Sequence, residues 1–234
     1  MVKGKMETNI LCSTAGIASQ MLLISADHYY VIDVGDGTLR DLISLKIDFH
    51  KIKGIFLTHG HSDHISGLYA LLAYFRMNER KDLIDIYYPE KCREPKELIG
   101  AFNHSYCDFS FQINIHEVKE GDEIKLNELK IKIFKMRHWA AVGKNRLLRP
   151  DVAVGYQFIH PEKTIAISGD TGMCPGLIEL VRGVDEAYID STLTDEEAND
   201  NILKCLHLTR KKAEEIGKLA KKYIPIHLQN NKAY

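Results

Sequence analysis

The sequence has no long apolar run and no excess of charge of one sign. No stretch approaches the roughly 20 apolar residues that cross a membrane, and segment 1–9 lacks the apolar core of a signal peptide. Its 31 Lys and Arg residues nearly balance 32 Asp and Glu residues, so the net charge of −1 provides no general attraction to nucleic acid or to an anionic membrane. We therefore expect a cytoplasmic protein without a membrane partner, and a nucleic-acid substrate would need a local basic patch.

Closely spaced cysteines are also missing. The five cysteines lie far apart and form no Cys-x-x-Cys pair, which argues against a zinc ribbon and against a disulfide framework. We expect reduced, mostly buried thiols. The chain has no internal repeat and no low-complexity segment, and 234 residues can bury the core of one domain. We therefore predict a single domain over residues 1–234.

Apolar residues recur with the periods of strands and helices along the chain. Alternating apolar and basic residues predict a strand over 129–136, with His138 just past its end. A nearly continuous run of apolar residues and good helix formers predicts one buried helix from His64 to Met77. The short strand expected over Tyr223–His227 contains Pro225, which confines it to a sheet edge or to the first strand position.

Strands fill both halves of the chain, and helices accompany them in each half. One of these helices is expected from Thr209 to Lys222, with apolar residues inward, lysines outward and Thr209 as the capping residue. This order of elements predicts the α/β class in an α+β four-layer arrangement. Two mixed β-sheets would pack together with helices outside, which is an αββα sandwich.

The most informative stretch is Thr58–Gly67, with the sequence THGHSDHISG, directly after an apolar run. His59 and His61 lie two residues apart, so both side chains leave the same face of an extended segment and can reach one ion. Asp63 and His64 follow where the chain can turn into a helix. Imidazole nitrogens and carboxylate oxygens suit zinc and similar ions. A solvated histidine-rich turn is the alternative, but an ordinary loop has no reason to place four possible ligands at a strand end.

Three further candidate ligands, His138, Asp170 and His227, lie at predicted strand ends or in the loop beyond. Two neighbouring ions need about seven or eight protein ligands with one bridging group. The chain supplies His59, His61, Asp63, His64, His138, Asp170 and His227. A water shared by two cations would provide hydroxide near neutral pH, which predicts metal-assisted hydrolysis. The alternatives are surface positions for His138 and His227 and a capping role for Asp170.

With these residues, and with DVGDGT after Ile32, SGDT around Asp170 and HLT at His207, the sequence resembles the metallo-β-lactamase fold superfamily over almost its whole length. Within it, the sequence is most similar to the ribonuclease Z family of tRNA 3′-end processing endonucleases. The resemblance implies the metallo-β-lactamase fold, two divalent metal ions, an RNA or other phosphodiester substrate, and a homodimer. Zinc is the expected metal, with manganese, iron and cobalt as alternatives.

The resemblance also implies how the ligands are shared. One ion would be held by His59, His61 and His138. The other ion would be held by Asp63, His64 and His227. Asp170 would bridge the two ions.

Three residues receive further roles from the same resemblance. Asp63 would orient or deprotonate the attacking hydroxide. His207 would act as general acid toward the leaving oxygen or stabilise the phosphate transition state; a position near a helix start without a catalytic role is the alternative. Asp33 would hold a ligand histidine or the loop from behind.

Two basic clusters near the candidate ligands can contact phosphates. One contains Lys144, Arg146 and Arg149, and the other contains Arg210 beside His207. The alternative is that these side chains are only solvated, as lysines and arginines on loops usually are.

We therefore predict a dinuclear metal-dependent phosphodiesterase that acts on an RNA 3′ end or on a small nucleotide. The small nucleotide is included because the long basic arm with which the ribonuclease Z family clamps the tRNA elbow is missing, and Asn231 stands where that family has an arginine. Hydrolysis of a carbon ester, lactone, lactam or thioester on the same metals is a second alternative. A non-catalytic metal-binding protein is the third.

Overall fold

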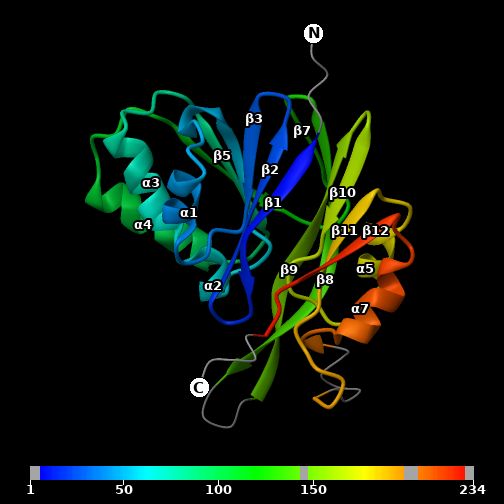
Figure 1. Ribbon diagram of the computed structural model, residues 1–234. Helices are drawn as coiled ribbons and strands as arrows, with labels where there is room; N and C mark the ends of the chain where they lie inside the picture. Colours follow the sequence, from blue (N-terminus) through cyan, green and yellow to red (C-terminus); the bar gives the residue numbers. More distant parts are fainter. Residues whose placement is uncertain (1–5, 143–146, 198–204, 230–234) are drawn as a thin grey trace. The chain divides into compact units, whose positions relative to one another are not determined.

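This computed structural model describes residues 6–142, 147–197 and 205–229, apart from the side chains of residues 141, 142 and 147–149. The chain divides between Glu117 and Val118 into two compact units. Each unit contains one mixed six-stranded sheet with helices beside it (Figure 1). The predicted pair of mixed sheets flanked by helices is confirmed, whereas one domain over residues 1–234 stays a prediction.

The sheet of the first unit has the strand order β1-β2-β3-β4-β5-β6. Its strands are β1 (Glu7–Thr14), β2 (Ala18–Ser25), β3 (His28–Ile32), β4 (Ile52–Phe56), β5 (Ile84–Pro89) and β6 (Ile113–Val118). β1, β2 and β3 pair antiparallel, whereas β3, β4 and β5 pair parallel. The carboxyl ends of these three parallel strands therefore lie at one edge of the sheet.

The described part of the first unit also contains five helical segments: α1 (Thr38–Ser44), the 3-10 helix η1 (Phe49–Lys51), α2 (Ser62–Ile65), α3 (Leu68–Met77) and α4 (Glu94–Ser105). α3 packs against α4 (Figure 1). The buried residues of α3 are Leu68, Leu71, Leu72 and Phe75. Their spacing of three and four residues places them on one face of the helix, and that face is buried.

The predicted single helix from His64 to Met77 is wrong, because α2 and α3 are separated by a break at Gly67. The segment after β3 fixes this break. Val34 N donates to His64 O at 2.7 Å, and Gly67 N donates to Val34 O at 2.8 Å. A Cβ atom at Gly67 would lie 2.3 Å from Gly35 O, so only glycine permits this approach. The end of the histidine-rich motif therefore lies on a short helix of its own.

The sheet of the second unit has the strand order β12-β11-β10-β9-β8-β7. Its strands are β7 (Glu123–Leu126), β8 (Leu129–Val142), β9 (Leu147–His160), β10 (Lys163–Ile167), β11 (Glu186–Asp190) and β12 (Lys222–Ile226). β10, β11 and β12 pair parallel, whereas β7, β8, β9 and β10 pair antiparallel in succession. β12 is an edge strand, so the predicted edge position of Pro225 is confirmed.

Two predicted boundaries in the second unit are wrong. His138 lies inside β8 and not past a strand end, because pairing with β9 continues from Met136 to Val142 although the apolar alternation has stopped. The helix predicted from Thr209 to Lys222 is only α7 (Arg210–Gly217), with Thr209 as its cap. The helix ends at Gly217, before the predicted end at Lys222, because the chain then turns and enters β12 at Lys222.

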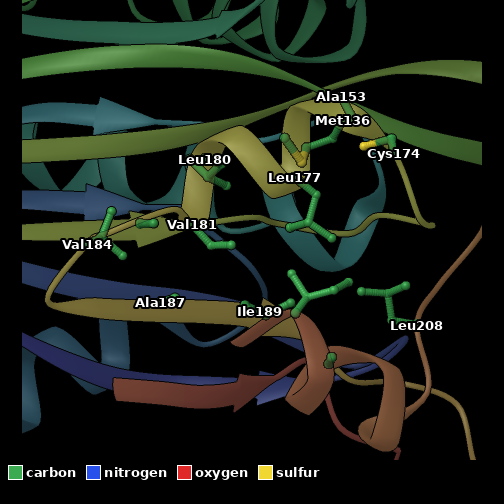
Figure 2. Packing of buried hydrophobic residues seen from close by; sticks show 13 residues of the cluster. Met136, Ala153, Cys174, Leu177, Leu180, Val181, Val184, Ala187, Ile189 and Leu208 are labelled. Atoms are coloured by element: carbon green, nitrogen blue, oxygen red, sulfur yellow. The ribbon is translucent and has the colours of Figure 1, made fainter. Parts of the chain in front are cut away.

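A hydrophobic core joins the second sheet to α5 (Pro175–Val181). Figure 2 shows Leu177, Leu180 and Val181 of α5 grouped with Ala187 and Ile189 of β11. The three helix residues follow a spacing of three and one, which directs them to the same side of α5. This packing fixes the positions of β10 and β11, and therefore the starting points of the loops that follow these two strands.

Arg80 is buried in the first unit, with only 2% of its surface exposed. Its guanidinium donates at 2.7–3.0 Å to four backbone carbonyls, those of Phe49, Ile52, Asp82 and Leu83. It also lies 4.8 Å from the ring centroid of Phe75, where a cation–π contact adds to the hydrogen bonds. Arg80 thus connects η1, the start of β4 and the chain before β5.

We expect Arg80→Ala to lower the free energy of unfolding by roughly 3 kcal/mol or more, because each buried acceptor left without a donor costs about 1–3 kcal/mol. Urea unfolding followed by circular dichroism measures this change. The matched control is Arg76→Ala, since Arg76 pairs with Asp108 in a solvent-exposed ion pair and such pairs contribute little. Equal losses in the two variants would contradict the structural role of Arg80.

Candidate metal centre

The loop after β4 carries the four candidate ligands of the first unit. His59 and His64 are fully buried, and His61 is half-buried. The ring centroids of His59 and His61 are 4.6 Å apart, and those of His59 and His64 are 4.1 Å apart. Asp63 Oδ2 lies 3.8 Å from His64 Nε2. The structure therefore brings these four predicted residues together.

Asp33 follows β3 at φ 55°, in the left-handed region that aspartate enters more readily than most residues. Its Oδ1 accepts from Thr58 N at 2.8 Å, and its Oδ2 accepts from Thr58 Oγ1 at 2.9 Å and from His64 Nδ1 at 2.7 Å. Thr58 Oγ1 also lies 3.1 Å from His59 Nδ1. One buried carboxylate thus orients His64 directly and His59 through Thr58.

Two neighbouring segments contact the loop from the same unit. At the tip of the β1–β2 hairpin, Gly16 N donates to Asp63 Oδ2 at 2.9 Å. The loop after β5 and the start of α4 approach Gly60, where a Cβ atom would lie 2.8 Å from Cys92 Sγ and 2.6 Å from Glu94 Oε2. Gly60 therefore lets the chain between two candidate ligands pack directly against the loop after β5.

The second unit places its candidates at the carboxyl ends of strands or close to them. Asp170 follows β10 and His227 follows β12, while His138 lies within β8, which runs in the same direction as β10. These three residues are 2%, 3% and 2% exposed, respectively. His138 Nδ1 donates to Leu206 O at 3.0 Å. The ring of His138 is thereby held from the chain that leads to α7.

Asp190, the fully buried last residue of β11, organises two histidines. Its Oδ2 accepts from His207 Nδ1 at 2.9 Å, and its Oδ1 accepts from Thr192 Oγ1 at 2.6 Å. Thr192 Oγ1 lies 2.8 Å from His227 Nδ1, so the hydroxyl that donates to Asp190 accepts from this ring. Candidate ligand atoms of Asp170, His207 and His227 lie within 4.8 Å of one another.

The predicted phosphate contacts fall into two groups. Arg210 is exposed and lines a cavity of about 270 Å³ that Thr192 also lines. Lys144 and Arg146 lie outside the described residues, and so does the side chain of Arg149 in β9. Phosphate binding by these four residues stays a prediction.

The donor set fits a divalent metal ion such as zinc. In five histidines, Nδ1 lies within hydrogen-bond distance of a carboxylate, a hydroxyl or a backbone carbonyl: His59, His64, His138, His207 and His227. Metal-binding histidines are usually held in this way, because the bond fixes the tautomer and directs the other nitrogen to the ion. Burial raises the pKa of the nearby Cys205 thiol, which keeps the thiol protonated at neutral pH and makes it a poor competing ligand.

Residues 30–228 match the profile of a family described as the beta-lactamase superfamily domain, a range that contains all seven predicted metal ligands. The chain belongs to the beta-lactamase superfamily. Ribonuclease Z from Archaeoglobus fulgidus is 25% identical to this superfamily member over 241 residues, which cover 85% of this chain and 77% of that protein. The predicted resemblance and the predicted class of metal-dependent hydrolase are confirmed.

Solved structures of other proteins share the fold of this beta-lactamase superfamily member. Human tRNase Z, short form, has a TM-score of 0.79 and 22% identity, and the match covers 96% of this chain and 93% of that chain. The metallo-beta-lactamase fold protein YhfI from Bacillus subtilis has a TM-score of 0.79 and 15% identity, with 99% and 89% covered. The predicted metallo-β-lactamase fold is confirmed. Among the described helices, none has the length and apolar character needed to cross a membrane.

Sequence reasoning missed three residues that hold the candidates of this superfamily member in place. Asp190 ends an apolar strand much as Asp33 follows one, and this repeated pattern could have identified it. Thr192 follows Asp190 by two residues, so its position just after the same apolar strand could have identified it too. Gly16 offers none, because its contact with Asp63 arises only when the β1–β2 hairpin folds over the loop.

We expect Asp33→Asn to weaken metal binding by roughly 10- to 100-fold, as is typical when a residue behind a metal ligand is changed. An amide has one accepting oxygen, so its NH2 group would face either Thr58 N–H or His64 Nδ1–H, and the support of the ligand ring is weakened. Competition with a chelator followed by mass spectrometry of the bound metal measures the change. The control is Asp36→Asn, because Asp36 is exposed and three residues away. Unchanged metal affinity in folded Asp33→Asn would disprove this role.

Proposed function

We propose that this superfamily member is a dinuclear metal-dependent phosphodiesterase that cleaves an RNA 3′ end or a smaller nucleotide phosphodiester. The observation that supports this function best is the position of His207. It lies beside Asp170 and His227, and its side chain is 19% exposed while that of its partner Asp190 is fully buried. An imidazole that is oriented from behind and accessible in front suits proton transfer to a leaving oxygen.

The proposed ligands are those that the ribonuclease Z resemblance implies. One ion would be held by His59, His61 and His138. The other would be held by Asp63, His64 and His227, with Asp170 between the two. When bound, such a pair of ions supplies a hydroxide nucleophile near neutral pH and offsets negative charge on the phosphate. Zinc is the proposed metal, and manganese, iron and cobalt suit the same donors.

Asp63 and His207 each carry out one of the two proton transfers of the reaction. Asp63 accepts the proton of the attacking water, and the Gly16 N–H on its Oδ2 keeps this carboxylate in one orientation. His207 donates a proton from Nε2 to the leaving oxygen, because its Nδ1–H is already engaged by Asp190. Asp190 acts as a positioning residue, since it touches the imidazole and not the substrate.

The relatives and the site support the proposed substrate class. A relative named ribonuclease Z and a structural neighbour named tRNase Z support RNA as the substrate. Arg210, at the start of α7 and near His207 in the chain, is the described residue proposed to contact a phosphate. A homodimer, which the ribonuclease Z resemblance implies, and the cytoplasmic location expected from the sequence belong to the same proposal.

An assay panel tests this function. Purified protein loaded with zinc or manganese should hydrolyse at least one of three substrates: precursor tRNA, cyclic nucleotides and bis-p-nitrophenyl phosphate. Removal of the metal by a chelator should abolish turnover, and re-addition should restore it. Failure on all three substrates would end the proposal, and rapid turnover of a lactone or thioester alone would replace it with acyl hydrolysis.

We expect His207→Ala to lower kcat by roughly 10²- to 10⁴-fold, the range for loss of a general acid. Metal content should stay unchanged in this variant, and mass spectrometry measures it. Asp190→Asn should also lower kcat and shift the basic limb of the pH–rate profile, because His207, the proposed general acid, loses its carboxylate partner. His104→Ala is the control, since His104 is exposed on α4. Full activity in His207→Ala would contradict the proposed proton transfer.

A further inference from the structure

One face of β8 carries two cations and the only tryptophan of the chain. Period-two spacing places Lys135, Arg137 and Trp139 on the same side of the strand, while Met136 and His138 between them are buried. Lys135 and Arg137 are exposed, and Trp139 is half-buried. All three line a hollow of about 370 Å³, which is within the size range of small-molecule sites.

The walls of this hollow are held by the fold of the second unit. Pro150, which also lines the hollow, is the direct partner of Trp139 in the β8–β9 ladder. The backbone of Arg137 is fixed from the chain that leads to α5. Arg137 N donates to Thr171 Oγ1 at 3.2 Å, and Gly172 N donates to Arg137 O at 2.7 Å. The backbone of Trp139 and of Arg137 is therefore held in place by hydrogen bonds of the second unit.

The charges of the hollow favour one class of ligand. Among the described residues, neither Lys135 nor Arg137 forms an ion pair, so both cations can accept an anion from solvent. Glu120 and Asp151 also line the hollow, and carboxylates accept hydrogen bonds from ribose hydroxyls or base amino groups. Two carboxylates disfavour a bare polyphosphate. An aromatic ring beside a cation is the usual way to hold a base by stacking and its phosphate by charge.

We propose that this hollow binds one nucleotide of the phosphodiester substrate, with the base stacked on Trp139 and the phosphate at Arg137 and Lys135. The subsite rests on the proposed phosphodiesterase function and adds recognition of a base to it. His138, a proposed metal ligand, also lines the hollow. The hollow and this proposed ligand therefore share strand β8 of the second unit.

Adenosine 5′-monophosphate is a suitable probe, because it contains base, ribose and phosphate but no diester bond to cleave. Titration of the whole, metal-loaded protein with this nucleotide should quench the fluorescence of Trp139 to saturation. Ribose 5-phosphate should leave the emission unchanged, since it has no base to stack. Adenosine should quench only at higher concentration, because it lacks the phosphate. Absence of quenching by the nucleotide, or equal quenching by ribose 5-phosphate, would overturn the subsite.

Variants locate the bound nucleotide, with calorimetry as the measurement of affinity. Trp139→Leu should weaken binding by roughly 5- to 150-fold, the usual effect of losing an aromatic base-stacking partner, whereas Trp139→Phe should retain most of the affinity. Arg137→Ala should also weaken binding, and Arg182→Ala, which changes an exposed arginine of the same unit outside the hollow, should not. Wild-type affinity in both Trp139→Leu and Arg137→Ala, with melting temperatures unchanged, would refute the subsite.

A substrate without a base separates this inference from the proposed function. Trp139→Leu should lose more efficiency with nucleotide substrates, mainly through KM, than with bis-p-nitrophenyl phosphate, which has no nucleobase to stack. Equal losses on both substrates would overturn the subsite and leave the phosphodiesterase function in place. Nucleotide quenching in a wild-type protein that cleaves no phosphodiester would refute the proposed function and support a nucleotide-binding hollow.

Discussion

Parallel strands that end side by side are the constraint on which both candidate half-sites depend. In the first unit β3, β4 and β5 end beside one another, and in the second unit β10, β11 and β12 do so. Main-chain hydrogen bonds hold these strand ends at fixed spacings, so the side chains just beyond them need not contribute to the sheet. They are consequently available for chemistry, which is why site residues scattered from Asp33 to His227 in sequence gather at the strand ends of the two sheets.

Each unit uses one buried carboxylate at such a strand end to organise its histidines. Asp33 and Asp190 both accept from a histidine Nδ1 and from a threonine hydroxyl, at 2.6–2.9 Å. A buried carboxylate is costly unless its oxygens are hydrogen-bonded. Because Asp33 and Asp190 meet this requirement through the same rings that they orient, any loosening of those rings also destabilises the fold around them. The order of the candidate centre and the stability of the strand ends are therefore coupled.

Local patterns in the sequence were sufficient for the part of the site that lies in consecutive residues. The motif from His59 to His64 could be recognised because spacing and strand context are both local. The break at Gly67 could not, because it depends on a backbone contact with Gly35 from another segment. The position of His138 inside β8 was missed for a similar reason, since the ladder with β9 continues where the side-chain alternation has ended. Asp190 was overlooked because a single aspartate after a strand is also typical of an ordinary cap.

Pro225 has a consequence beyond its place in β12. This strand forms the edge of the second sheet, and a proline there offers no N–H to a further strand. If a strand of another protein paired with β12, one of its carbonyl groups would lack the N–H donor that Pro225 does not have. Such pairing is therefore unfavourable. The end of β12 that leads to His227 is thus protected against capture by another protein's strand, a hazard for any protein that keeps reactive side chains beside an open sheet edge.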